Sequence, residues 1–239
     1  MRRTNPVTTL ILIAKEPIAG RVKTRLTPDV TFGQAAMLAS AAIADTVAAG
    51  SAVSASRRIL YYDGTIPPTG TEGWDVVPQV DGDLDERLAA ILDLCNGPTV
   101  LLGMDTPQVT GDLLAPMFRP WPDGVDAWFG PASDGGFWCI ALAEPRGDLV
   151  RGVPMSRDDT GAIQYDRMRA AALTIALLPT LTDVDTIDSA REVAALAPST
   201  RFAAMFAQVT DAKIVEPQIP ETQPAGTQTD APLASRSTR

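Results

Sequence analysis

The amino-acid sequence predicts an α/β protein with one mixed, mostly parallel central sheet and helices on both faces. Short apolar segments alternate with segments of helical periodicity, and 239 residues with 45% hydrophobic content can bury one sizeable core. Two apolar segments, residues 126–132 and 137–143, follow each other with only a short polar link. Such neighbours pair as an antiparallel hairpin, so we expect a mixed sheet.

The expected strands are short runs of apolar and β-branched residues. They cover residues 7–14, 57–63, 74–79, 98–105, 126–132, 137–143 and 173–179. The expected helices carry apolar residues at intervals of three and four and begin or end at capping residues. They cover residues 31–50, 83–95, 106–118, 159–172 and 187–197.

The composition changes near residue 216, where the chain becomes rich in Pro, Thr, Gln and Ala and nearly lacks large apolar residues. Such a segment cannot offset its ordering entropy by burial. We therefore expect one domain over residues 1–215 and a disordered tail over residues 216–239.

Charge and composition exclude several classes of function. A net charge of −9 argues against general nucleic-acid binding. The chain has no histidine, which excludes Ser-His-Asp catalysis and histidine-based zinc sites. Two cysteines in apolar surroundings predict free thiols in a reducing cytoplasm. We expect neither a signal peptide nor a membrane span, and the sequence does not indicate the oligomeric state.

A basic cluster follows the first expected strand. Gly20 precedes Arg21, Lys23 and Arg25, which fall within five positions. Ligands of open α/β sheets lie beyond the carboxyl ends of the strands, so these cations are placed to bind a small anion such as a nucleotide phosphate. The alternative is a solvated basic loop that pairs with surface acids.

Aspartates follow later strands. Asp105 lies at the end of a central strand, and Asp183 and Asp185 follow the last one. Carboxylates at these places can bind Mg²⁺ or Mn²⁺, which prefer oxygen ligands. Asp105 and Asp185 are equally suited to cap the helices that follow them.

Two further groups lie in expected loops. Asp134, Gly135 and Gly136 link the two hairpin strands, where they form either a tight turn or the wall of a sugar or acceptor pocket. Asp83 begins an expected helix, where a carboxylate also favours the helix dipole.

Taken in order, residues 10–26, 82–88, 101–107, 130–142 and 177–189 resemble a bacterial family labelled as GT-A-like or arsenosugar-biosynthesis-type glycosyltransferases. The resemblance spans residues 7–197 and implies the nucleotide-diphospho-sugar transferase fold. The chain departs from the family pattern at Ala19, before Gly20, and at Ile187 and Asp188, after Thr186.

The resemblance also implies roles for individual residues. It implies nucleotide binding by the first loop and the start of the second expected helix, namely Ala14, Lys15, Gly20, Arg21, Lys23, Arg25 and Asp83. It implies metal ligands at Asp105 and Asp185, and a sugar or acceptor pocket at Asp134, Gly135 and Gly136. The expected catalytic residues are Asp105, Lys23 and Asp134, with Mg²⁺ or Mn²⁺ as the cofactor.

Three functions remain open at this point. The first is glycosyl transfer from a nucleotide-activated sugar to a small-molecule acceptor, with Asp134 as the candidate base. The second is nucleotidyl transfer with release of pyrophosphate, which the three clustered cations suit. The third is a nucleotide-binding regulatory module without catalysis.

Overall fold

A computed structural model of the chain describes residues 7–215 and contains a seven-stranded sheet in the order β3-β2-β1-β4-β6-β5-β7. The strands are β1 (Thr9–Lys15), β2 (Arg57–Asp63), β3 (Asp75–Pro78), β4 (Thr99–Leu102), β5 (Ala127–Pro131), β6 (Phe137–Leu142) and β7 (Ile175–Leu177). Strand β6 runs antiparallel to both of its neighbours, and every other pairing is parallel. The predicted mixed, mostly parallel sheet is therefore confirmed.

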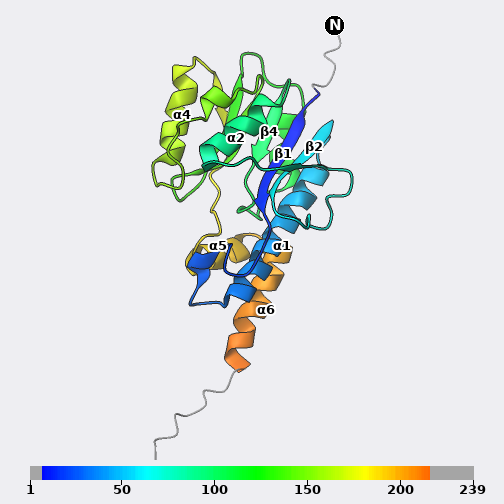
Figure 1. Ribbon diagram of the computed structural model, residues 1–239, viewed down its shortest axis with the longest axis vertical. Helices are drawn as coiled ribbons and strands as arrows, with labels where there is room; N and C mark the ends of the chain where they lie inside the picture. Colours follow the sequence, from blue (N-terminus) through cyan, green and yellow to red (C-terminus); the bar gives the residue numbers. More distant parts are fainter. Residues whose placement is uncertain (1–6, 216–239) are drawn as a thin grey trace, which may run out of the picture.

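Helices cover both faces of the sheet (Figure 1). They are α1 (Phe32–Ser51), α2 (Leu84–Asp93), α3 (Gly111–Leu114), α4 (Thr160–Ala170), α5 (Ile187–Leu196) and α6 (Arg201–Val215), with short 3₁₀ helices η1 (Thr24–Leu26), η2 (Ala115–Phe118) and η3 (Gly147–Leu149). Thr31, where the helix was predicted to begin, is the N-cap of α1. Its hydroxyl accepts from the backbone amide of Gln34, and the side-chain oxygen of Gln34 accepts from the backbone amide of Thr31.

The helix predicted over residues 106–118 is wrong in extent. Its first part is non-helical, and Thr110 caps the four-residue α3 by accepting from the amide of Leu113. Pro116 then lies at the start of η2. Because proline has no N–H to continue the α-helical ladder, the chain tightens into a 3₁₀ turn.

Strand β1 shows why two cores form. Successive strand side chains point to opposite faces, so Leu10 and Leu12 pack with α1 and α3, while Ile11 packs with α2 and α4. A third cluster lies beyond the sheet, where the first half of α1 meets α5 and α6 (Figure 1). Leu26 and Val184, from two different loops, are both buried in this third cluster.

Helix α6 was not predicted, and its start is capped both by the preceding Thr200, whose hydroxyl accepts from the amide of Ala203, and by a residue distant in sequence. The buried carboxylate of Asp45 on α1 accepts from the amides of Arg201 and Phe202, at 3.0 and 2.8 Å. Helix α1 is also long and apolar enough to pass for a membrane span by length and composition, contrary to our expectation. In the fold it is a core helix, since 61% of that stretch is buried.

Both cysteines, Cys95 and Cys139, are free and buried, as predicted. Burial raises the pKa of each thiol. The tail expected over residues 216–239 lies outside the residues that the structure describes.

Candidate functional site

A cleft of about 740 Å³ lies at the carboxyl ends of β1 and β4 and the start of β6. The position agrees with the rule that open α/β sheets bind ligands beyond the carboxyl ends of their strands. Most of the residues predicted for the site line this cleft, namely Ala14, Lys15, Arg21, Lys23, Arg25, Asp105, Asp134, Gly136 and Asp185. The fold thus brings together distant loops, since Lys23 contacts Val184 across a separation of 161 positions in the sequence.

Lys23 lies at the bottom of the cleft. Its ammonium is 2.6 Å from Oδ1 of Asp105, and it also donates to the carbonyl of Val184. Its side chain is only 7% exposed, whereas that of Asp105 is 41% exposed. The Lys23 backbone has the left-handed conformation with φ 50°, which is uncommon for a residue with a side chain. This turn directs the lysine inward instead of into solvent.

Arg25 contacts the loop between β7 and α5 through Asp185. Its Nη1 lies 2.5 Å from Oδ2 of Asp185; the side chain of Arg25 is largely exposed, and that of Asp185 is partly exposed. The hydrogen bond and the negative charge of Asp185 raise the pKa of Arg25. Two of the three clustered cations are therefore neutralised by the aspartates that we expected to bind a metal.

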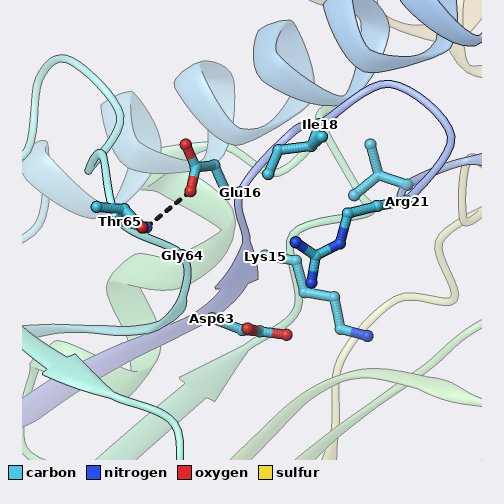
Figure 2. A pocket seen from close by; sticks show the side chains of 8 residues that line it. Lys15, Glu16, Ile18, Arg21, Asp63, Gly64 and Thr65 are labelled. Carbon is cyan, nitrogen blue, oxygen red and sulfur yellow. Dashed lines mark hydrogen bonds between the residues drawn. The ribbon is translucent and has the colours of Figure 1, made fainter.

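Arg21 and Lys15 differ from these two cations. Both line the main cleft and a smaller adjoining cavity of about 350 Å³, which Asp63, Gly64 and Thr65 close on the side of β2. Figure 2 shows both cationic side chains in this cavity, while the carboxylate of Glu16 is held by the amide of Thr65 at 2.7 Å. Among residues 7–215, neither the Arg21 guanidinium nor the Lys15 ammonium has an ion pair or hydrogen bond.

Asp183 is the carboxylate with the most perturbed environment in the cleft. Its pKa is raised to about 7, mainly by burial and also by the negative charges of Asp105, Asp134 and Asp185, against the opposing effect of Lys23. Its Oδ1 is buried without a hydrogen-bond partner. Around Asp183, three other carboxylates therefore outnumber the single ammonium of Lys23.

The loop of Asp134 is a tight turn that packs against a neighbouring loop. Oδ1 of Asp134 accepts from the amide of Gly136 at 2.9 Å. Gly135 has φ +89°, and a Cβ there would lie 1.8 Å from the carbonyl oxygen of Asp158. Asp134 and Gly136 reach the cleft, but Gly135 does not line it. A glycine is required at position 135 by the positive φ of the turn and by the close approach of Asp158.

Two predicted nucleotide-binding residues lie outside the cleft lining. Gly20 has φ +78° in the exposed loop after β1, with nothing near the position of a Cβ. Asp83 occupies the N-cap position of α2, although its side chain makes no capping hydrogen bond.

The sequence analysis missed the apolar half of the cleft. Its wall consists of strand, helix and loop side chains that are far apart in sequence, namely Ile13, Leu84, Leu88, Leu101, Phe137 and Met155. It also missed Asp63 and Gln79, which come from the ends of β2 and β3. Asp63 and Gln79 could have been found from the sequence, since both are polar residues at the carboxyl ends of expected strands.

Comparison with solved structures identifies the fold. A "putative nucleotide-diphospho-sugar transferase" from Desulfovibrio desulfuricans G20 superposes with a TM-score of 0.71 at 24% identity, over 87% of this chain and 95% of that one. The chain therefore has the nucleotide-diphospho-sugar transferase fold. It belongs to the bacterial family described as "Uncharacterized protein conserved in bacteria (DUF2064)", whose profile matches residues 36–157.

More distant structures resemble the chain weakly. A mannosyltransferase from Pyrobaculum calidifontis, in complex with GDP-Man and Mn²⁺, is 12% identical over 91% of this chain and 67% of that one, with a TM-score of 0.49. A cytidylyltransferase from Leptospira borgpetersenii is 11% identical over 92% of this chain and 99% of that one, also with a TM-score of 0.49. No curated protein matches the chain.

Proposed function

We propose that the protein is a transferase that binds a nucleotide-activated sugar in this cleft and transfers the sugar to a small-molecule acceptor. The observation that carries the proposal is the division of the cations. Lys23 and Arg25 are bound to aspartates, whereas the side chains of Lys15 and Arg21, which line both cavities, have no ion pair within residues 7–215. Unpaired cations next to a glycine-containing loop are suited to the phosphates of a nucleotide diphosphate.

The donor set is chemically suited to Mg²⁺ or Mn²⁺. Asp105, Asp183 and Asp185 all line the cleft and supply carboxylate oxygens, and Oδ1 of Asp183, which is buried without a hydrogen-bond partner in the described part of the chain, is suited to contact a cation. The carboxylates are not preassembled, because no group of three metal-binding side chains is close enough to hold an ion within the described part of the chain. When bound, the cation would supply charge stabilisation to the departing diphosphate.

The side chains of the chain itself would do the remaining work. Arg21 offers a planar fork to phosphate oxygens, and Lys15 offers a compact charge beside it. Lys23, which is held in place by Asp105 and Val184, places a fixed positive charge at the bottom of the cleft, where a leaving diphosphate would gain negative charge. Asp134 faces the cleft from the hairpin turn and is the candidate to accept the proton of the acceptor hydroxyl.

Nucleotidyl transfer is the second candidate. The cleft is lined by a series of four cations, of which Lys15 and Arg21 also line the smaller cavity, while Lys23 and Arg25 are paired with aspartates. A series of that extent is suited to a triphosphate whose pyrophosphate departs along it. This reaction needs alignment and charge stabilisation more than a base, so it would leave Asp134 without a catalytic role.

A thermal-shift panel tests the proposal and separates the two reactions. The protein is heated with UDP, GDP, CDP, ADP or dTDP, or with the matching triphosphate, each with and without Mn²⁺. A ligand that binds only the folded state raises the melting temperature by mass action. Stabilisation by one diphosphate that requires Mn²⁺ is the expected result, whereas preference for a triphosphate would favour nucleotidyl transfer. No shift with any nucleotide would refute the proposal.

A further inference from the structure

The motif at residues 82–88 contains an arginine, Arg87, to which neither the cleft lining nor the proposed reaction assigns a role. Its side chain is three-quarters buried. Nε donates to the carbonyl of Gly82 at 2.8 Å, and Nη1 donates to Oε1 of Gln79 at 3.2 Å. Nη1 also lies 3.8 Å from Oδ2 of Asp63. One guanidinium on α2 thus contacts the ends of β2 and β3 and the loop between β3 and α2.

Gln79 continues this network to β1. Its Nε2 donates to the carbonyls of Ala14 and Tyr61, both at 3.0 Å. Because Ala14 directly precedes Lys15, the amide of Gln79 fixes the peptide from which the cationic loop departs. An amide side chain can flip, and the bond from Arg87 to Oε1 reinforces the orientation, set also by the two carbonyls, in which Nε2 faces Ala14.

We propose that Arg87 is a positioning residue for the anion site. It acts through Gln79, which it holds in the orientation that fixes Ala14 and therefore the side chain of Lys15. This inference rests on the proposed function in one respect only, namely that the cationic loop binds phosphate. A lysine cannot replace Arg87, because a point charge cannot contact the Gly82 carbonyl, the Gln79 amide and the Asp63 carboxylate together.

The chain offers a matched control in Arg151. It also binds α2, through Glu86 at 3.0 Å and Asp93 at 3.2 Å, but it lies away from the cleft lining. Arg151→Met therefore removes an arginine that contacts the same helix, from the loop after η3, without removing a partner of Gln79. Both variants are expected to lower the melting temperature by a few degrees, because each removes hydrogen bonds to charged groups.

Binding of inorganic pyrophosphate, measured by calorimetry, is the first readout. Arg87→Met is expected to raise the Kd on the order of tenfold, as is typical when a partner that orients a binding group is lost. Arg151→Met should leave the Kd unchanged, and Arg87→Lys should resemble Arg87→Met. Equal effects of Arg87→Met and Arg151→Met would overturn the proposal, because loss of stability alone would then account for both.

A double-mutant cycle tests whether Arg87 acts through Gln79. If it does, Gln79→Met and the double variant Gln79→Met/Arg87→Met should bind pyrophosphate about as weakly as Arg87→Met alone. Additive losses would show that Arg87 acts by another route. Arg151→Met combined with Arg87→Met should be additive, since the two residues share no partner in the network.

Hydrogen exchange of the ligand-free protein tests the positioning role of Arg87 independently of pyrophosphate binding. Peptides covering residues 14–23 should exchange faster in Arg87→Met and Gln79→Met than in the wild type or Arg151→Met. If the wild-type protein does not bind pyrophosphate but the two variants still exchange faster, the assignment of the phosphate site is wrong and the positioning role of Arg87 stands. Unchanged exchange in this segment would overturn the positioning role.

Discussion

The ammonium of Lys23 lies 2.6 Å from Oδ1 of Asp105 and also donates to the carbonyl of Val184. One buried side chain therefore joins the loops after β1, β4 and β7. The amide of Val184 donates in turn to the carbonyl of Asp105 at 2.9 Å, so the last two loops are also bonded directly. Leu26 and Val184 pack in one core cluster beneath this junction. The helical part of the fold thus supports the loops that form the charged end of the cleft.

Replacement of Lys23 tests this junction. Lys23→Met keeps most of the side-chain volume but leaves the Val184 carbonyl without its donor and Asp105 without its cation. We expect the free energy of unfolding to fall by about 1–3 kcal/mol, because the bond is largely buried while Asp105 remains partly solvated. Chemical denaturation measures this change. Lys15→Met is the control, since Lys15 has no partner in the described residues, and a similar loss there would contradict the account.

Replacement of Arg21 tests the unpaired cations. Arg21→Gln should weaken binding of a nucleoside diphosphate about tenfold at low salt, because it removes hydrogen bonds between two charged groups. The difference between variant and wild type should shrink as ionic strength rises and screens the exposed charges. Calorimetric titrations at two salt concentrations measure both effects. If the variant and the wild type bound the nucleotide equally well at both salt concentrations, the residues after Gly20 would be a surface loop with no role in binding.

The pairing of Arg25 with Asp185 predicts competition with a metal ion. A divalent cation that binds Asp185 must share its oxygens with a guanidinium 2.5 Å away. Arg25→Gln should therefore lower the Kd for Mn²⁺ several-fold, as followed by the loss of the free-ion spectroscopic signal. Arg21→Gln removes the same charge without freeing a carboxylate. If both variants tighten Mn²⁺ binding equally, the cause is the loss of a repelling positive charge and not the release of Asp185 from a competing guanidinium.

Asp183 predicts an unusual pH dependence of stability. Its pKa is about 7 in the folded protein against an ordinary value of 3.8, so between these values the folded state binds more protons than the unfolded state. Asp183 therefore reduces stability progressively as pH rises from about 4 to 7. Asp183→Asn should remove this loss and raise the free energy of unfolding at pH 8, by an amount on the order of 2 kcal/mol. Parallel denaturation curves at pH 5 and pH 8 for both proteins measure it. An unchanged pH dependence would contradict the burial of a destabilised carboxylate.

Much of the fold follows from local patterns in the sequence. The strand predicted over residues 57–63 coincides with β2, and Thr31 caps α1 because Thr31 and Gln34 are neighbours in sequence. The predictions failed for one local and one partly distant reason. Pro116, within an otherwise helical pattern, shortens α3, and the start of α6 is bonded to Asp45 on α1 in addition to its own Thr200.

The candidate site was predictable in position but not in pairing. Cations and aspartates at strand ends can be found from the sequence, because strand ends are visible as apolar runs. The partner of each cation depends on how the loops fold over the sheet. Nothing local distinguishes Lys23, whose side chain is 7% exposed and ion-paired, from Arg21, which lines an open cavity. The same loop packing desolvates the carboxyl group of Asp183 while the side chain of Asp185 stays partly exposed.

The most direct measurement of the central claim is the affinity for the stabilising nucleoside diphosphate, with and without Mn²⁺, in the wild type and in Asp105→Asn. Asparagine keeps the shape of the side chain and can still accept a hydrogen bond from the buried Lys23 ammonium, so the variant should fold. The account predicts that Mn²⁺ tightens binding at least tenfold in the wild type and has little effect in Asp105→Asn. An equal effect of Mn²⁺ on both proteins would contradict the assignment of Asp105 and of the cleft built around it.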